Sequence, residues 1–138
     1  MPTVLLIRHG ENDFVKKQRL AGRLPGVHLN ERGRQQAATL ADWQGRPLAL
    51  ARRHKTWRIL QNHPSQFRFP NGESMLEQQA RLVGEIAALC AMHKPKDVIA
   101  CVGHADPIKL IIAYYLGLPL DQFQRIACDT ASVSTLHI

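Results

Sequence analysis

The chain has 138 residues, of which 45% are hydrophobic and 21% charged, with 18 Lys and Arg against 11 Asp and Glu. This length favours a single domain with a buried core, and this composition excludes wholesale disorder. The net charge of +7 favours phosphorylated or otherwise anionic partners. Nucleic acid is not expected as a partner, because no arginine-rich stripe with interleaved aromatic residues is present.

The three cysteines, Cys90, Cys101 and Cys128, are widely separated and show no metal-ligand spacing. Each lies among apolar residues, which indicates buried thiols in a reducing compartment. No basic stretch precedes a signal-length apolar run at the N-terminus, and no segment approaches the length of a membrane span. We therefore expect a cytoplasmic protein with no membrane partner.

Residues 4–7 are apolar and mostly branched, and a polar turn that begins with Arg8 and His9 follows them directly. Such a short run, bounded by glycine, predicts a buried strand rather than a helix. Residues 98–102 repeat the pattern, and His104 lies in the turn behind them. If the two strands are parallel, their carboxyl ends meet at one edge of the sheet, where ligands bind in open α/β sheets. The pattern therefore predicts that the two histidines converge on an anion.

The segment that follows the first strand carries weaker signals. Residues 11–28 are polar and contain glycine and proline, which predicts a long loop, and Asn30 is a favourable N-cap for a helix over residues 31–40. Residues 48–60 have a helical composition. A group of basic side chains in this region is interpreted mainly as a solvated helix face, with an anion-attracting rim as the alternative: Arg46, Arg52, Arg53, Lys55 and Arg58.

Ser74 and Glu77 have the spacing of a capping box, which predicts a helix that starts there and runs to about His93. Its buried face is expected to consist of apolar residues that recur at steps of three and four: Leu76, Ala80, Val83, Ala87 and Cys90.

The last third of the chain contains one further helix signal and one strand signal. Asp106 and Pro107 predict the N-cap and the first residue of a buried helix over residues 108–116, and Gly117 predicts its end. Residues 132–138 alternate and are β-branched, which predicts a final strand.

The polar residues behind the two strands suit phosphoryl chemistry. A neutral imidazole can attack phosphorus and form a phosphohistidine, provided that one ring nitrogen of His9 is held by a backbone acceptor. The Arg8 guanidinium offers planar, bidentate binding of phosphate oxygens, and Gly10 allows a substrate close to the backbone. His104 could donate to a phosphoryl oxygen as charge develops there. The simpler alternative is that Arg8 and His9 are polar residues with a structural role only.

These segments resemble, in order, the motifs of the histidine phosphatase superfamily, also called phosphoglycerate-mutase-like. Residues 8–11 (Arg-His-Gly-Glu) resemble its signature, and residues 103–104 (Gly-His) resemble its second-histidine motif. Parts of residues 19–37 resemble the segment behind the signature, and residues 70–74 resemble the Gly-Glu-Ser start of a helix. Because four motifs occur in family order over nearly the whole chain, the chain is identified as a member.

The resemblance implies an α/β fold, a three-layer sandwich around a small, mainly parallel sheet. It implies that Arg8 binds phosphate, that His9 is the phosphorylated nucleophile, and that His104 binds phosphate and stabilises the transition state. Most members are phosphomonoesterases or phosphoglycerate mutases and need no metal, so no cofactor is expected. Glu11 is a further catalytic candidate. The expected substrate-binding residues are Arg8, Gly10, Asn12, Arg19, Gly22, Gly103 and His104.

The chain departs from the family pattern near residue 41. At this point the family has a strand that ends in a Ser-Pro-Leu turn, a second phosphate-binding arginine and a proton-donating glutamate, and this block is missing here. We therefore expect one truncated domain over residues 1–138. Arg52 and Thr56 have the family's Arg-to-Thr spacing, but no predicted strand precedes them, so we interpret the match as chance. A missing strand leaves backbone groups unpaired, which invites homo-oligomerisation.

The sequence thus predicts a phosphatase that hydrolyses a small phosphomonoester through a phosphohistidine on His9. The sequence does not identify the proton donor, for which the candidates are Glu11, Asp13, Glu73 and Asp106. Loss of general acid catalysis typically costs about 10²–10⁴-fold in rate. The alternatives are therefore a catalytically impaired phosphate-binding or scaffold member of the family, and a phosphoglycerate mutase.

Overall fold

The computed structural model describes residues 2–10 and 48–138. The described residues form two compact units, one made of residues 2–10 and 76–138 and the other of residues 48–75. No helix within these residues is long and apolar enough to cross a membrane. All three cysteines are free thiols, with Cys128 buried and the other two partly buried.

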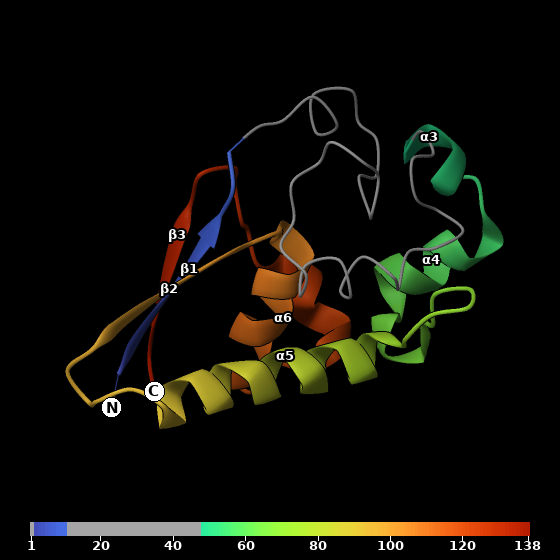
Figure 1. The fold of residues 1–138 in the computed structure, drawn as a ribbon. Helices are drawn as coiled ribbons and strands as arrows, with labels where there is room; N and C mark the ends of the chain where they lie inside the picture. The colour runs from blue at the N-terminus through green and yellow to red at the C-terminus, as the bar shows by residue number, and fades with distance from the viewer. Residues whose placement is uncertain (1, 11–47) are drawn as a thin grey trace. The chain divides into compact units, whose positions relative to one another are not determined.

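The first unit is built on a three-stranded sheet with β1 (Thr3–Arg8) in the middle (Figure 1). On one side β1 pairs in parallel with β2 (Val98–Gly103), and on the other it pairs in antiparallel fashion with β3 (Val133–His137). The sheet is therefore mixed. The three predicted strands are confirmed, and so is the parallel pairing of the two strands that precede the histidines.

The sheet has one covered and one exposed face, because side chains alternate along each strand. Val4, Leu6 and Ile99 are at most 8% exposed, and the register places Val4 beside Ile99. The opposite face carries Val98 and Val102, which keep 64% and 69% of their accessible surface. This alternation fixes the register of the sheet, since a slip by one residue would expose the buried side chains.

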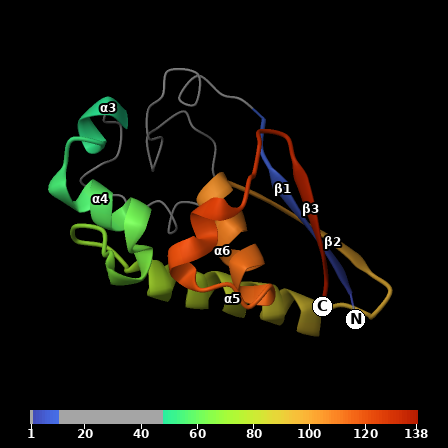
Figure 2. The same cartoon turned by 180° about the vertical axis from the view of Figure 1, so that it is seen from behind.

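Helix α6 (Ala105–Tyr115) contacts β1 and buries four apolar side chains: Ile108, Leu110, Ile111 and Ala113. Figure 2 shows it beside the sheet, with its first turn next to the end of β2. The prediction that Asp106 is the N-cap was wrong, because the chain turns helical directly behind the strand and His104 is the N-cap. Asp106 instead lies in the first turn. The helix ends where predicted, with Gly117 at a φ of 66° that favours glycine.

Helix α5 (Met75–Ala91) begins directly after Ser74, close to the predicted start. Its buried face was predicted wrongly: Leu76 is 51% exposed, whereas Gln78, Leu82 and Ile86 are buried. Apolar residues occur nearly all round this helix, so periodicity could not select the buried face. The Gln79 side chain donates from Nε2 to the Leu110 carbonyl at 2.9 Å, which links α5 to α6.

A 3₁₀ helix, η3 (Leu120–Arg125), follows α6 and was not predicted. Phe123 is fully buried in it and Leu120 is 8% exposed, so this short helix contributes to the core of the first unit. The chain then passes through residues 126–132 to β3, and this connection runs past the end of β1.

The second unit contains α3 (Leu48–Ala51), α4 (Lys55–Asn62) and the 3₁₀ helix η2 (Pro64–Gln66). The helical composition of residues 48–60 was interpreted correctly, but His54 is the N-cap of α4 and splits the segment into two helices. Phe67 and Phe69 pack edge to face with ring centres 4.8 Å apart. The basic side chains described here are exposed, as expected of a solvated helix face: Arg52, Arg53, Lys55 and Arg58.

Candidate active site

The candidate site begins where β1 leaves the sheet. The register pairs Arg8 with Gly103, and the next backbone N–H, that of His9, donates to the Gly103 carbonyl at 3.1 Å. On the other side of β1 the Arg8 N–H donates to the Ser132 carbonyl at 3.0 Å. Backbone hydrogen bonds to both neighbours therefore hold the end of β1 in place.

The two predicted histidines lie in direct contact. His9 Nε2 is 2.8 Å from His104 Nδ1, and the two rings meet edge to face with centres 4.7 Å apart. Both side chains emerge from the carboxyl ends of parallel strands, as the sequence pattern requires. The prediction that β1 and β2 deliver two imidazoles to one point is therefore confirmed; that the point binds an anion stays a prediction.

The hydrogen bonds assign a tautomer to each neutral ring. His9 Nδ1 lies 2.7 Å from the Gly10 carbonyl oxygen, which can only accept, so this nitrogen carries the proton. His9 Nε2 then has a free lone pair. His104 Nδ1 must therefore donate to it, because two lone pairs cannot form a hydrogen bond. The arrangement leaves a lone pair on His9 Nε2 and makes His104 Nδ1 a donor that points at this lone pair.

His104 is held in its neutral form. Burial lowers the pKa of His104 below its ordinary value of 6.5, and the neighbouring His9 and Arg8 lower it further. Its position as N-cap of α6 also places it at the positive end of the helix dipole, which disfavours a second positive charge. In the neutral ring, Nδ1 carries the proton that is donated to His9, and Nε2 is an acceptor.

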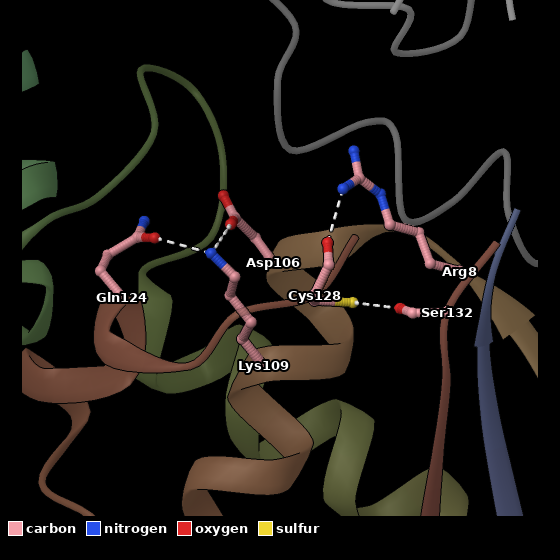
Figure 3. A network of polar contacts seen from close by, with 6 residues as sticks. All are labelled: Arg8, Asp106, Lys109, Gln124, Cys128 and Ser132. Carbon is pink, nitrogen blue, oxygen red and sulfur yellow. Dashed lines mark hydrogen bonds and ion pairs between the residues drawn. The ribbon is translucent and has the colours of Figure 1, made fainter. Parts of the chain in front are cut away.

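Arg8 is fixed by the connection between η3 and β3. Its Nη1 donates to the Cys128 carbonyl oxygen, and Figure 3 shows the guanidinium reaching over this carbonyl. Cys128 is itself buried, and its Sγ lies 3.7 Å from Ser132 Oγ. A guanidinium has five N–H donors in a rigid fork, so one bond to a carbonyl leaves others able to bind an oxyanion.

A second group of polar side chains joins the first turns of α6, which carry Asp106 and Lys109, to Gln124 in η3 (Figure 3). Lys109 Nζ is 3.1 Å from Gln124 Oε1 and 4.0 Å from Asp106 Oδ1. Burial raises the pKa of the Asp106 carboxyl above 3.8, while Lys109 and, more weakly, Arg8 act to lower it. The Asp106 side chain keeps 49% of its surface, so the rise is smaller than in an enclosed carboxyl.

Five predicted site residues lie together at this edge of the sheet: Arg8, His9, Gly10, Gly103 and His104. Four others fall outside the described residues: Glu11, Asn12, Arg19 and Gly22, as does the donor candidate Asp13. Of the remaining donor candidates, Asp106 lies in the turn behind His104, whereas Glu73 belongs to the second unit.

Sequence reasoning missed three residues at the site: Cys128, Lys109 and Gln124. The Cys128 carbonyl binds Arg8 through its backbone, so no side-chain signal existed. Lys109 could have been found, since it follows Asp106 at a spacing of three residues on a predicted helix, where opposite charges meet. Gln124 lies in η3, which the sequence did not predict.

Comparison with known proteins identifies the family. The model of the histidine phosphatase superfamily (branch 1) matches residues 4–44 and 40–138, nearly the whole chain in two segments. The chain belongs to this superfamily. The resemblance drawn from the sequence motifs is thereby confirmed.

Similar histidine phosphatases are longer than this chain. Phosphoserine phosphatase 1 of Hydrogenobacter thermophilus is 24% identical over 186 aligned positions, covering 100% of this chain and 87% of the relative. Since the chain has 138 residues, part of that alignment has no counterpart here. The chain is thus a short member of the superfamily.

Solved structures show the same fold at low sequence identity. Bacillus stearothermophilus YhfR matches with a TM-score of 0.78 at 17% identity, covering 98% of this chain and 90% of that one. A mutant phosphoserine phosphatase of Entamoeba histolytica, in complex with phosphoserine, matches with a TM-score of 0.75 at 16% identity and the same coverage. Mycobacterial glucosyl-3-phosphoglycerate phosphatase in complex with VO₃ matches with a TM-score of 0.74 at 21% identity, covering 96% and 91%. The α/β, phosphoglycerate-mutase-like fold class is confirmed.

Proposed function

We propose that this protein is a phosphatase that hydrolyses small phosphomonoesters through a phosphohistidine on His9. The observation that carries the proposal is the contact between His9 Nε2 and His104 Nδ1 at 2.8 Å, with Arg8 held beside it. The relatives support a phosphatase, since their names describe enzymes that act on phosphoserine and on glucosyl-3-phosphoglycerate.

Substrate binding replaces the hydrogen bond between the two histidines. The phosphoryl group enters at His9 Nε2, and the His104 Nδ1–H then donates to a phosphoryl oxygen instead of to the ring. The free N–H groups of Arg8 bind the other oxygens as charge-assisted hydrogen bonds, each worth about 1.5–3 kcal/mol. The Cys128 carbonyl keeps the guanidinium oriented, so little side-chain entropy is lost on binding.

The first chemical step transfers the phosphoryl group to His9. The lone pair on Nε2 forms the N–P bond while the bond from phosphorus to the ester oxygen breaks, and the alcohol leaves with that electron pair and takes up a proton. The Gly10 carbonyl stabilises the developing imidazolium through the Nδ1–H bond of 2.7 Å. The neutral His104 donates to the oxygen on which negative charge grows.

The second step returns the enzyme to its starting state. Water attacks phosphorus, the N–P bond breaks with its electron pair returning to Nε2, and inorganic phosphate leaves. Among the sequence candidates beyond the described residues, Glu11, Asn12, Arg19 and Gly22 are proposed as the remaining contributors to the site.

The truncated single-domain architecture also stays a proposal. It is supported by the family match, which falls into two segments that meet at residues 40–44, where the sequence lacks the strand, the second arginine and the donor glutamate.

We propose a cytoplasmic location, because all three cysteines are free thiols. The exposed face with Val98 and Val102 supports homo-oligomerisation, which sedimentation of wild-type protein against Val102→Lys tests.

Phosphoenzyme trapping tests the proposed function. Wild-type protein mixed with 4-nitrophenyl phosphate should release a burst of one equivalent of nitrophenol and form an acid-labile phosphoprotein, and His9→Ala should give neither. The rates of hydrolysis of phosphoserine and 3-phosphoglycerate are then compared, to test small phosphomonoesters as substrates. Binding of phosphate or vanadate without burst and turnover would favour the scaffold alternative. Movement of the phosphoryl group within phosphoglycerate, without release to water, would indicate a mutase.

A further inference from the structure

Phosphoryl transfer to His9 requires a proton for the leaving alcohol, and the residues used so far do not provide it. His9 Nε2 forms the bond to phosphorus, and its Nδ1–H is bonded to Gly10. The Nδ1–H of His104 donates to a phosphoryl oxygen. The Arg8 guanidinium cannot act as an acid near neutral pH. A carboxylic acid beside these groups would complete the reaction.

Asp106 is the described carboxyl whose place in the fold fits this need. It lies in the first turn of α6, two residues after His104, so the helix start that positions one group also positions the other. The Arg8 charge lowers the pKa of both His104 and Asp106, so it acts on both groups. Figure 3 shows the Asp106 carboxyl and the Arg8 guanidinium projecting toward the same side, beyond the N-terminal turn of α6.

Other carboxyls of the first unit fit less well. Asp97 lies just before β2, at the end of that strand opposite to His104, and its Oδ2 accepts the Lys94 N–H at 2.9 Å. Asp129 is close in sequence to Cys128, but it belongs to the connection between η3 and β3 and not to the turn that follows His104.

The surroundings of Asp106 suit a group that must both hold and release a proton. Burial favours the neutral acid and raises its pKa, whereas the charges of Lys109 and Arg8 stabilise the carboxylate once the proton has left. Lys109 is itself only 14% exposed and is held by Gln124 at 3.1 Å, so its ammonium group stays near Asp106 Oδ1. A structural ion pair would need only the lysine and the carboxylate, whereas here Gln124 holds the lysine as well.

We propose that Asp106 is the proton donor of the phosphatase reaction and that Lys109 and Gln124 are positioning residues for its carboxyl group. This inference rests on the proposed function. As the bond between phosphorus and the ester oxygen breaks, the Asp106 O–H proton passes to that oxygen, leaving a free alcohol and a carboxylate. In the second step the carboxylate takes a proton from the attacking water, which restores the acid. Each turnover therefore returns Asp106 to its starting form.

A leaving-group comparison tests the proposal. Nitrophenolate leaves without a proton, whereas the alkoxide of phosphoserine does not, so loss of the donor should affect only the second substrate strongly. We expect Asp106→Asn to slow phosphorylation of His9 by phosphoserine by about 10²–10⁴-fold and by 4-nitrophenyl phosphate by less than about tenfold. Asp106→Glu should recover part of the phosphoserine rate. Asp129→Asn, the matched control, should resemble the wild type with both substrates.

The outcomes separate this inference from the proposed function. If wild-type protein forms phosphoenzyme but Asp106→Asn slows both substrates equally, or neither, Asp106 is not the donor while the phosphatase stands. Retained activity of Asp106→Asn on 4-nitrophenyl phosphate also shows that the variant folds. If that variant does not fold, Asp106→Glu provides the same test. Its longer side chain moves the acid, so the ratio of the rates with phosphoserine and with 4-nitrophenyl phosphate must change if Asp106 is the donor. Absence of phosphoenzyme in the wild type overturns both.

Discussion

His9 Nε2 and His104 Nδ1 lie 2.8 Å apart although the two residues are 95 positions apart in the chain. The parallel pairing of β1 with β2 brings them together, and the hydrogen bond from the His9 backbone N–H to the Gly103 carbonyl holds the two strand ends in register. One ring is oriented by the Gly10 carbonyl and the other by the start of α6. The proposed nucleophile and its neighbouring donor are thus pre-organised by backbone structure.

The first prediction concerns the donor on His104. His104→Ala removes the Nδ1–H group, and we expect kcat on 4-nitrophenyl phosphate to fall by about 10²–10³-fold, as for loss of one oxyanion donor. His104→Asn keeps an N–H group on a short side chain and should retain more activity than the alanine variant. Steady-state kinetics measure both. Equal losses in the two variants would show that the ring acts by filling space rather than by donating.

The second prediction follows from the lowered pKa of His104. In the unfolded chain this ring binds a proton as the pH falls below 6.5, whereas in the folded protein it stays neutral until a lower pH. The unfolded state then binds more protons, so the free energy of unfolding decreases as the pH is lowered across this window. Urea unfolding at several pH values should show a smaller acid-side loss in His104→Asn than in the wild type. An unchanged slope would contradict a neutral, half-buried His104.

The third prediction concerns Arg8, whose Nη1 is bound to the Cys128 carbonyl. Arg8→Ala should weaken inhibition by phosphate or vanadate about 10–100-fold, which corresponds to loss of charge-assisted hydrogen bonds of about 1.5–3 kcal/mol. Arg8→Lys keeps the charge but loses the planar fork, so it should recover only part of this affinity. Competitive inhibition constants measure the effect. Full recovery by lysine would mean that charge alone binds the anion.

Much of this site could be predicted from the sequence, because its main residues directly follow two strands. Short apolar runs bounded by glycine specify buried strands, and parallel strands bring their carboxyl ends to one edge. The positions of Arg8, His9 and His104 at that edge therefore follow from the sequence pattern alone. The register between β1 and β2 follows from the condition that the buried side chains of both strands face the same side of the sheet.

The parts that the sequence did not predict depend on packing over longer distances. The Cys128 carbonyl reaches Arg8 only because the connection between η3 and β3 passes the end of β1, and a backbone acceptor has no sequence pattern. The prediction of the buried face of α5 was wrong because this helix is apolar on several sides, and only the side with Leu82 and Ile86 is buried. The prediction that Asp106 is the N-cap of α6 was wrong because Asp and Pro are favourable in the first turn of a helix as well as at its start.

The fourth prediction concerns backbone strain next to the site. Ala131 has a φ of 58°, which costs an L-residue about 1–2 kcal/mol, and its N–H lies 3.4 Å from the His9 carbonyl oxygen. Ala131→Gly removes the strain but adds about 0.5–1 kcal/mol of unfolded-chain entropy to be lost on folding. We expect a net gain of about 0.5 kcal/mol in the free energy of unfolding, measured by urea titration. A loss of stability would show that the methyl group contributes to packing.

The last prediction uses stability to examine Asp106 independently of activity. Its raised pKa means that the folded protein binds a proton more readily than the unfolded chain, whose Asp titrates near 3.8. The contribution of this carboxyl to stability is therefore fully present below pH 3.8 and is lost as the pH rises through the folded-state pKa. Asp106→Asn removes the ionisable group. The free energy of unfolding of the variant minus that of the wild type should therefore be larger at pH 7 than at pH 3.5, which means that the variant is relatively more stable at pH 7. Urea titrations at the two pH values measure this difference. If the variant instead loses relative stability at pH 7, the ion pair with Lys109 outweighs burial, and Asp106 holds its charge rather than its proton.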